Sequence, residues 1–158
     1  MPNKKRNDPE HQEQIKLISR CRLSSAGLLT GYPKIPELGK IYSVPNGGLR
    51  TVTEASKLKN EGVRAGVLDL ALDTAHGGFF GLKIEMKAPG KITNTSDEQD
   101  DEIEFLDEGG YCVRVCDTWQ KAWEHLLWYV SLPNTIGTPA KVKTSIQKEL
   151  SKLIRAEL

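Results

Sequence analysis

The stretch that decides the fold runs from Gly66 to Lys87 and reads GVLDLALDTAHGGFFGLKIEMK. Apolar residues alternate along 67–72 and again along 80–87, which is the spacing of half-buried strands. The residues between them, 73–78, include the turn-forming pair Gly77-Gly78. The stretch therefore predicts a hairpin of two antiparallel strands.

Three charged residues stand on these predicted strands, where apolar residues are the norm. Because side chains alternate between the faces of a strand, Glu85 and Lys87 share one face, and a hairpin brings Asp69 close to Glu85. Two carboxylates supply hard oxygen ligands for a divalent cation, and the ammonium lies beside them. These groups can activate a water molecule and cleave a phosphodiester bond, so the motif predicts a metal-dependent nuclease.

Hydrophobic periodicity and turn signals extend the prediction along the rest of the chain. The predicted order is α-β-α-β-β-α-β-α plus a C-terminal helix, which indicates an α/β fold with a mixed sheet flanked by helices. The predicted helices are 10–23, 51–61, 97–108, a helix after Asp117 and a basic amphipathic helix over 140–157; the predicted strands are 41–44, 67–72, 80–87 and 111–115.

Capping residues mark where two of these helices begin. Thr95 or Ser96 precedes the helix over 97–108 and offers a side-chain oxygen to its first turn. Asp117 followed by Gln120 has the spacing of a capping box and predicts the start of the next helix there. Gly109 and its neighbour end the acidic helix.

Length and composition are those of a soluble globular protein. The 158 residues, with 38% hydrophobic and 27% charged side chains, suit a single core. Residues 1–9 are expected to be a flexible basic segment, 10–131 the folded domain, and 132–158 a linker with the basic helix. No apolar run reaches about 18 residues, and the N-terminus lacks the apolar centre of a signal peptide, so we expect a cytoplasmic protein without a membrane partner.

Three cysteines, Cys21, Cys112 and Cys116, cannot all pair, and an odd number suits a reducing compartment. Cys112 and Cys116 are four residues apart, so a structural zinc site is an alternative. They lie on a predicted strand without a second pair of ligands, and we expect reduced thiols packed as small apolar groups.

Charge is distributed unevenly along the chain. Residues 97–108, DEQDDEIEFLDE, carry eight acidic side chains and no basic one. Since the whole chain has a net charge of +1 and this stretch −8, the remainder carries +9, enough for contacts with a polyanion. A solvated helix face with scattered basic residues explains the same numbers.

Taken together, these features resemble the virus-type replication-repair nuclease domain (VRR-NUC) of the PD-(D/E)XK superfamily, closest to short stand-alone phage versions. The likeness spans roughly residues 10–131. Where the family has Pro before the aspartate, this chain has Leu68, a change expected to affect backbone stiffness more than chemistry. The matching pieces are Glu10-x-x-x-Gln14, Pro45-Asn46-Gly47-Gly48-x-Arg50, Gly66-x-x-Asp69-Leu70, Gly81-Leu82-x-Ile84-Glu85-x-Lys87, Gln99, and Gly110-Tyr111-x-Val113.

The resemblance implies a restriction-endonuclease-like core and a DNA nuclease that uses Mg²⁺ or Mn²⁺. It also implies a homodimer that cleaves branched DNA, including four-way (Holliday) junctions, in a DNA-repair role in a bacterial or phage-infected cytosol. Two readings from other classes stay open: a catalytically silent DNA-binding module, and an assembly subunit whose partner carries the nuclease.

The site residues follow from the motif and from the resemblance. Asp69 and Glu85 are expected to bind the metal, and Lys87 to orient and help deprotonate the attacking water or to neutralise the phosphate. The resemblance adds the carbonyl of Met86 and the carboxylate of Glu10 as metal ligands, with Glu13 as the competing choice to Glu10.

Further residues complete the predicted site. Gln99, an amide among acids, is expected to hydrogen-bond to water or phosphate near the metal. Arg50, Arg64 and Lys91 are expected to contact DNA phosphates.

Overall fold

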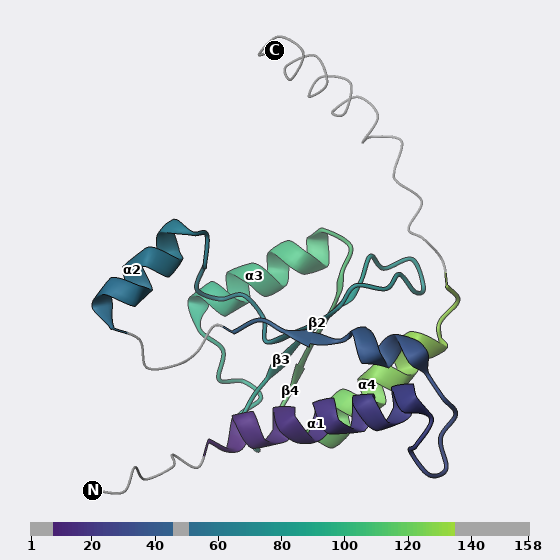
Figure 1. Cartoon of the computed structure of the whole chain (residues 1–158). Helices are drawn as coiled ribbons and strands as arrows, with labels where there is room; N and C mark the ends of the chain where they lie inside the picture. The colour runs from purple at the N-terminus through teal and green to yellow at the C-terminus, as the bar shows by residue number, and fades with distance from the viewer. Residues whose placement is uncertain (1–7, 46–50, 135–158) are drawn as a thin grey trace, which may run out of the picture.

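The computed structural model describes residues 8–45 and 51–134 (Figure 1). Within these ranges the elements follow the predicted order, and the predicted helix over 140–157 lies outside them. The helices are α1 (Pro9–Ala26), the short 3₁₀ helix η1 (Pro36–Lys40), α2 (Val52–Asn60), α3 (Asp97–Glu108) and α4 (Trp119–Ser131). The strands are β1 (Tyr42–Ser43), β2 (Leu70–Leu72), β3 (Leu82–Met86) and β4 (Cys112–Cys116).

The four strands form one mixed sheet in the order β1-β2-β3-β4. β1 and β3 run antiparallel to β2, and β4 runs parallel to β3. Leu70 pairs with Ile84, which confirms the predicted hairpin. An α/β fold with a mixed sheet is therefore the observed architecture.

Three of the four strands are shorter than predicted, and at β2 the reason is visible. The prediction started this strand at Val67, whereas β2 starts at Leu70. The N–H of Met86 donates to the Asp69 carboxylate at 2.8 Å, where a continued ladder would bond the backbone of Leu68. A side-chain contact thus replaces the strand pairing at this point.

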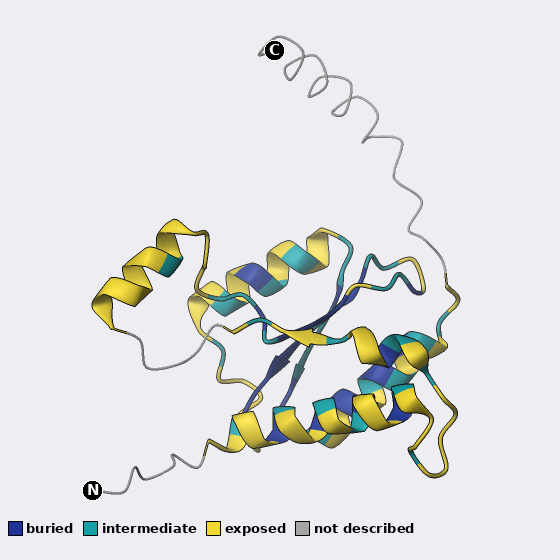
Figure 2. Cartoon of the chain, in the orientation of Figure 1, coloured by how far each residue is buried: buried dark blue, intermediate teal, exposed yellow. Residues whose placement is uncertain are grey.

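Helices cover both faces of the sheet, with α1 and α4 on one side and α3 on the other (Figure 1). Figure 2 shows the buried residues on the strands and on the sides of α1 and α4 that face them. The apolar core thus lies between the sheet and these two helices, and burying its side chains is the main stabilising contribution. Its members are Leu17, Cys21, Leu38, Leu70, Leu72, Leu82, Ile84, Met86, Cys112, Cys116, Ala122, Trp123, Leu126 and Tyr129.

The structure confirms one predicted helix cap and corrects the other. Ser96 caps α3, and its hydroxyl accepts a hydrogen bond from the backbone of Gln99. The prediction that Asp117 caps α4 is wrong, since the hydroxyl of Thr118 accepts from the backbone of the helix instead. The Asp117 carboxylate instead accepts the N–H of Gly90 and the Nζ of Lys121 in the first turn of α4.

All three cysteines are buried with free thiols. Burial raises the pKa of Cys21 to about 12 and that of Cys116 to about 11, so both thiols are neutral at physiological pH. Residues 8–45 and 51–134 contain no group of three His, Cys, Asp or Glu side chains with the geometry of a metal centre. The two strand cysteines thus pack in the core, as expected. Among the same residues, no helix is long and apolar enough to cross a membrane.

A buried histidine, His76, links three segments: the hairpin loop, η1 and the end of α4. His76 lies in the hairpin loop, 4% exposed. Its Nε2 is 2.7 Å from a carboxylate oxygen of Glu37 in η1, and its Nδ1 is 3.0 Å from the carbonyl oxygen of Leu132 at the end of α4. The ring also meets Tyr129 edge to face. A protonated imidazole donates to both oxygens at once.

We expect the domain to lose stability as the pH rises above about 6.5. Desolvation lowers the pKa of His76, but the hydrogen bonds to Glu37 and Leu132 and the charge of Glu37 outweigh it, so the pKa is raised. The stabilisation is complete below the unfolded-state pKa and is lost as the pH rises through the folded-state pKa. Urea denaturation between pH 6 and pH 9 measures this slope. His76→Gln should flatten it and cost about 1–3 kcal/mol at low pH, whereas replacement of the exposed His11 by Gln should leave the slope unchanged.

Candidate metal and catalytic site

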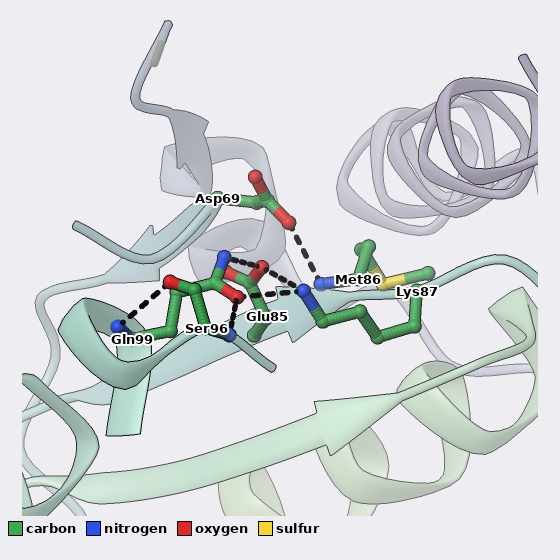
Figure 3. Close-up of polar contacts among 6 residues, drawn as sticks. All are labelled: Asp69, Glu85, Met86, Lys87, Ser96 and Gln99. Carbon is green, nitrogen blue, oxygen red and sulfur yellow. Dashed lines mark hydrogen bonds and ion pairs between the residues drawn. The ribbon is translucent and has the colours of Figure 1, made fainter. Parts of the chain in front are cut away.

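The charged residues of the hairpin meet on the sheet face that α3 covers. Asp69 directly precedes β2, and Glu85 lies on β3 opposite it in the continued register. One Asp69 oxygen accepts the N–H of Met86, and Glu85 is only 1% exposed (Figure 3). The two carboxylates therefore converge, as the alternation of side chains predicted.

Lys87 is fixed by two oxygen acceptors. Its Nζ donates to Oε1 of Glu85 and to Oε1 of Gln99, each at 2.8 Å (Figure 3). The Nε2 of Gln99 donates to the same oxygen of Glu85. Lys87 is only 6% exposed, so its ammonium is held in one position by buried partners.

Gln99 has a second task at the start of α3. Its Oε1 also accepts the N–H of Ser96 at 3.1 Å, which completes a capping box. We expected Gln99 to bind water or phosphate, but the structure engages its amide with Ser96, Lys87 and Glu85. It is a positioning residue that ties the helix start to the strand.

The environment of the carboxylates favours their neutral forms. Burial raises the pKa of Glu85 to about 7, against the opposing effect of Lys87, and the charge of Asp69 raises it further. Burial also raises the pKa of Asp69, although the Met86 N–H and the Lys87 charge oppose that shift. Two converging carboxylates repel each other unless a cation lies near them.

The donor set fits magnesium or manganese. Oε2 of Glu85 is buried and makes no hydrogen bond to any described residue. This orphaned oxygen, together with the Asp69 carboxylate, provides the hard ligands that these ions prefer, and magnesium commonly needs only one or two carboxylates beside its waters. The absence of a cluster of three acidic, His or Cys ligands among the described residues accords with such a site.

The structure separates the two candidate carboxylates of α1. Glu13 is 7% exposed and accepts the N–H of Trp119 at 2.8 Å, so it fastens α1 to the start of α4. Glu10 lies in the first turn of α1, where burial and the charge of Asp69 raise its pKa while the charge of Lys87 lowers it. Glu10 thus lies near enough to Asp69 and Lys87 for their charges to shift its pKa. The Glu13 carboxylate is instead occupied by its hydrogen bond from Trp119.

The basic residues predicted to bind DNA differ in their surroundings. Arg50 lies outside the described residues. Arg64 makes a two-pronged ion pair with Glu102 of α3, at 3.0 and 3.1 Å, although its side chain is 62% exposed. Lys91 is exposed in the turn that follows β3. Of the two described cations, Lys91 is therefore the more available for contact with a phosphate, because Arg64 is already paired with Glu102.

Our prediction overlooked a close approach between Gly66 and α3. Gly66 has φ +81°, and a Cβ atom there would lie 2.3 Å from the carbonyl oxygen of Glu98. Only glycine fits both the conformation and the contact. The signal in the sequence is a glycine three residues before Asp69.

Comparison with known proteins finds a likeness among solved structures. No protein-family model and no curated protein matches the sequence. A solved structure described as "VRR_NUC domain protein" superposes on this chain with a TM-score of 0.62 and 29% sequence identity. The likeness covers 82% of this chain and 93% of that one, which is most of both.

Proposed function

Since the chain is similar over most of its length to a VRR_NUC domain protein, we propose that it is a nuclease of this type, a Mg²⁺- or Mn²⁺-dependent endonuclease that hydrolyses phosphodiester bonds in DNA. The observation that carries the proposal is the placement of Lys87. Its buried ammonium lies between Glu85 and Gln99, beside a second carboxylate, Asp69.

Asp69 and Glu85 are the proposed metal ligands, together with the carbonyl of Met86. Glu10, which the structure does not group with these two carboxylates, would join them once a bound cation draws its side chain in. The bound ion supplies Lewis acidity and lowers the pKa of its water ligands. The protein holds the two carboxylates at the end of paired strands, so their geometry is set before substrate arrives. Preorganisation of this kind is a large part of the catalytic effect in such sites.

Lys87 is the proposed catalytic residue next to the metal. Its three N–H groups exceed the two acceptors that hold it, so one remains to contact the attacking water or a phosphate oxygen. The ammonium neutralises negative charge as it develops on the phosphate. Since Gln99 fixes the ammonium from one side, little reorganisation is needed during the reaction.

Branched DNA, including four-way junctions, is the proposed substrate, and a homodimer with two such sites is the proposed assembly. Electrostatics support a polyanionic partner, because the chain outside 97–108 carries the net positive charge and Lys91 lies exposed just after the site-bearing strand.

Cleavage of a substrate panel tests the function directly. Labelled four-way junctions, flaps, duplexes and single strands are incubated with the full chain in Mg²⁺, in Mn²⁺ and in EDTA. We expect metal-dependent cuts, with junctions preferred over duplex, and a dimer by light scattering. Absence of cleavage of every DNA in both metals would overturn the proposal.

A further inference from the structure

A cavity of about 210 Å³ lies on the sheet face that carries the proposed site. Its floor includes Ala71 of β2 and Lys83 of β3, which pair directly across the two strands. Leu106 of α3 covers it, and the rings of Tyr42 and Tyr111 contribute to its wall. Tyr42 is 46% exposed, so the cavity opens to solvent beside this ring.

The cavity lies beside the proposed site on β2, β3 and α3, the three elements that position residues of both. Ala71 follows Asp69 by two residues, and Lys83 precedes Glu85 by two, so the cavity floor and the carboxylates lie on one face about 7 Å apart along the strands. On α3, Glu102 lines the cavity one turn after Gln99. A nucleic-acid strand whose phosphate lies at the carboxylates therefore passes the mouth of the cavity.

Size and lining select a small planar ring system. The volume lies below the range of about 300–1,000 Å³ that drug-sized ligands occupy. The walls are aliphatic and aromatic, which suits the faces of a base. Two charged side chains line the cavity. The carboxylate of Glu102 accepts from Arg64. The ammonium of Lys83 is paired with Asp73 at 2.8 Å, lies 5.0 Å from the centre of the Tyr111 ring, and has further N–H groups to donate. They provide one acceptor and one donor for the edge of a base.

We propose that this cavity receives a single nucleobase, unstacked from the DNA strand that is being cut. The base stacks on the tyrosine side chains, and its edge meets Lys83 and Glu102. This inference rests on the proposed nuclease function and adds a specificity site to it.

The base pocket gives a physical reason for a preference for branched DNA. Extracting a base from a duplex costs stacking and pairing energy, and the cost is smallest where the base is already unpaired or mismatched. Nucleotides at the crossing point of a junction or flap meet that condition. The pocket thus selects phosphodiester bonds next to an unpaired nucleotide.

Photochemical crosslinking tests the pocket without relying on cleavage. A four-way junction carries 4-thiothymidine at one position at a time around the branch point and is irradiated with the full-length Lys87→Ala protein in EDTA. Mass spectrometry then locates the crosslinked residue. We expect a crosslink from a single nucleotide position to Tyr42 or Tyr111.

Two substitutions on α3 distinguish an effect of the pocket from an effect of the helix surface. Leu106→Trp fills the cavity and should lower the crosslink yield about 5-fold or more, the lower end of the effect of losing one base–aromatic stack. Phe105→Trp is the matched control, because Phe105 is the next residue and is 70% exposed, so its yield should not change. Tyr111→Leu, which keeps most of the bulk and removes the ring, should lower the yield as Leu106→Trp does.

Each outcome decides the inference separately from the nuclease function. Crosslinks spread over many positions, or a yield that Leu106→Trp leaves unchanged, would overturn the base pocket even when the wild-type protein cleaves junctions. Failure of the wild-type protein to cleave any DNA in the substrate panel would overturn the nuclease function, and the pocket with it.

Discussion

Lys87→Ala is expected to lower the rate of metal-dependent DNA cleavage by about 10²–10³-fold or more, the effect of removing one preorganised charge-stabilising group. The ammonium is held by Glu85 and Gln99, so the variant loses a charge that is positioned before substrate binds. Binding of junction DNA should survive, because contacts to the phosphate backbone come from exposed basic residues. Single-turnover cleavage and gel-shift titration measure the two quantities.

The variant should also stay folded, which keeps the result interpretable. Removing one partner of a buried ion pair is usually costly, but the pKa of Glu85 is already raised to about 7, so this carboxyl can take up a proton instead of remaining an unpaired charge. Lys59→Ala removes an exposed lysine on α2 that is assigned no role in the site and is the matched control, expected to cleave at close to the wild-type rate. Wild-type cleavage by Lys87→Ala would refute the catalytic assignment.

Glu85→Gln is expected to abolish binding of Mn²⁺ and, in the absence of metal, to leave the domain at least as stable as the wild type. Glutamine keeps the shape and an oxygen acceptor for Lys87 and Gln99. It also removes a buried carboxylate whose ionisation desolvation and Asp69 oppose. The substitution should therefore remove the metal affinity without lowering the stability, which is typical of a residue retained for function.

Calorimetry and thermal unfolding measure these two effects. Titration of the wild type with Mn²⁺ should release or absorb heat, and at a concentration 100 times the Kd the metal should stabilise the domain by about 2.7 kcal/mol. Neither effect should remain in Glu85→Gln, and Asp69→Asn should behave alike. Glu104→Gln, an exposed carboxylate on α3, is the control. An unaltered Mn²⁺ affinity of Glu85→Gln would remove this residue from the metal site.

The parts of the fold that sequence predicted correctly are those set by near neighbours. The alternation around Asp69 and Glu85, with a Gly-Gly turn between, specifies the hairpin and its register, because a slip by one residue would turn every apolar side chain to the wrong face. The cap at Ser96 likewise depends on residues three apart. Local chemistry decides such features before tertiary contacts form.

The parts that sequence did not resolve depend on which elements dock together. Glu10 and Glu13 are equivalent on an isolated helix, and the N–H of Trp119, more than a hundred residues away, claims Glu13. Asp117 has the spacing of a cap, yet the turn at Gly90 takes its carboxylate. Arg64 resembles a free cation until α3 places Glu102 beside it. The cavity needs two strands and a helix from distant segments.

The two tasks of Gln99 have a consequence for the life of the chain in a cell. The amide that closes the first turn of α3 is also the one that holds Lys87 against Glu85. A molecule whose helix start has frayed therefore loses the Gln99 contact and keeps only Glu85 to position the ammonium. The proposed cutting activity is thereby tied to an intact first turn of α3, so partly unfolded copies should cut DNA more slowly than native ones.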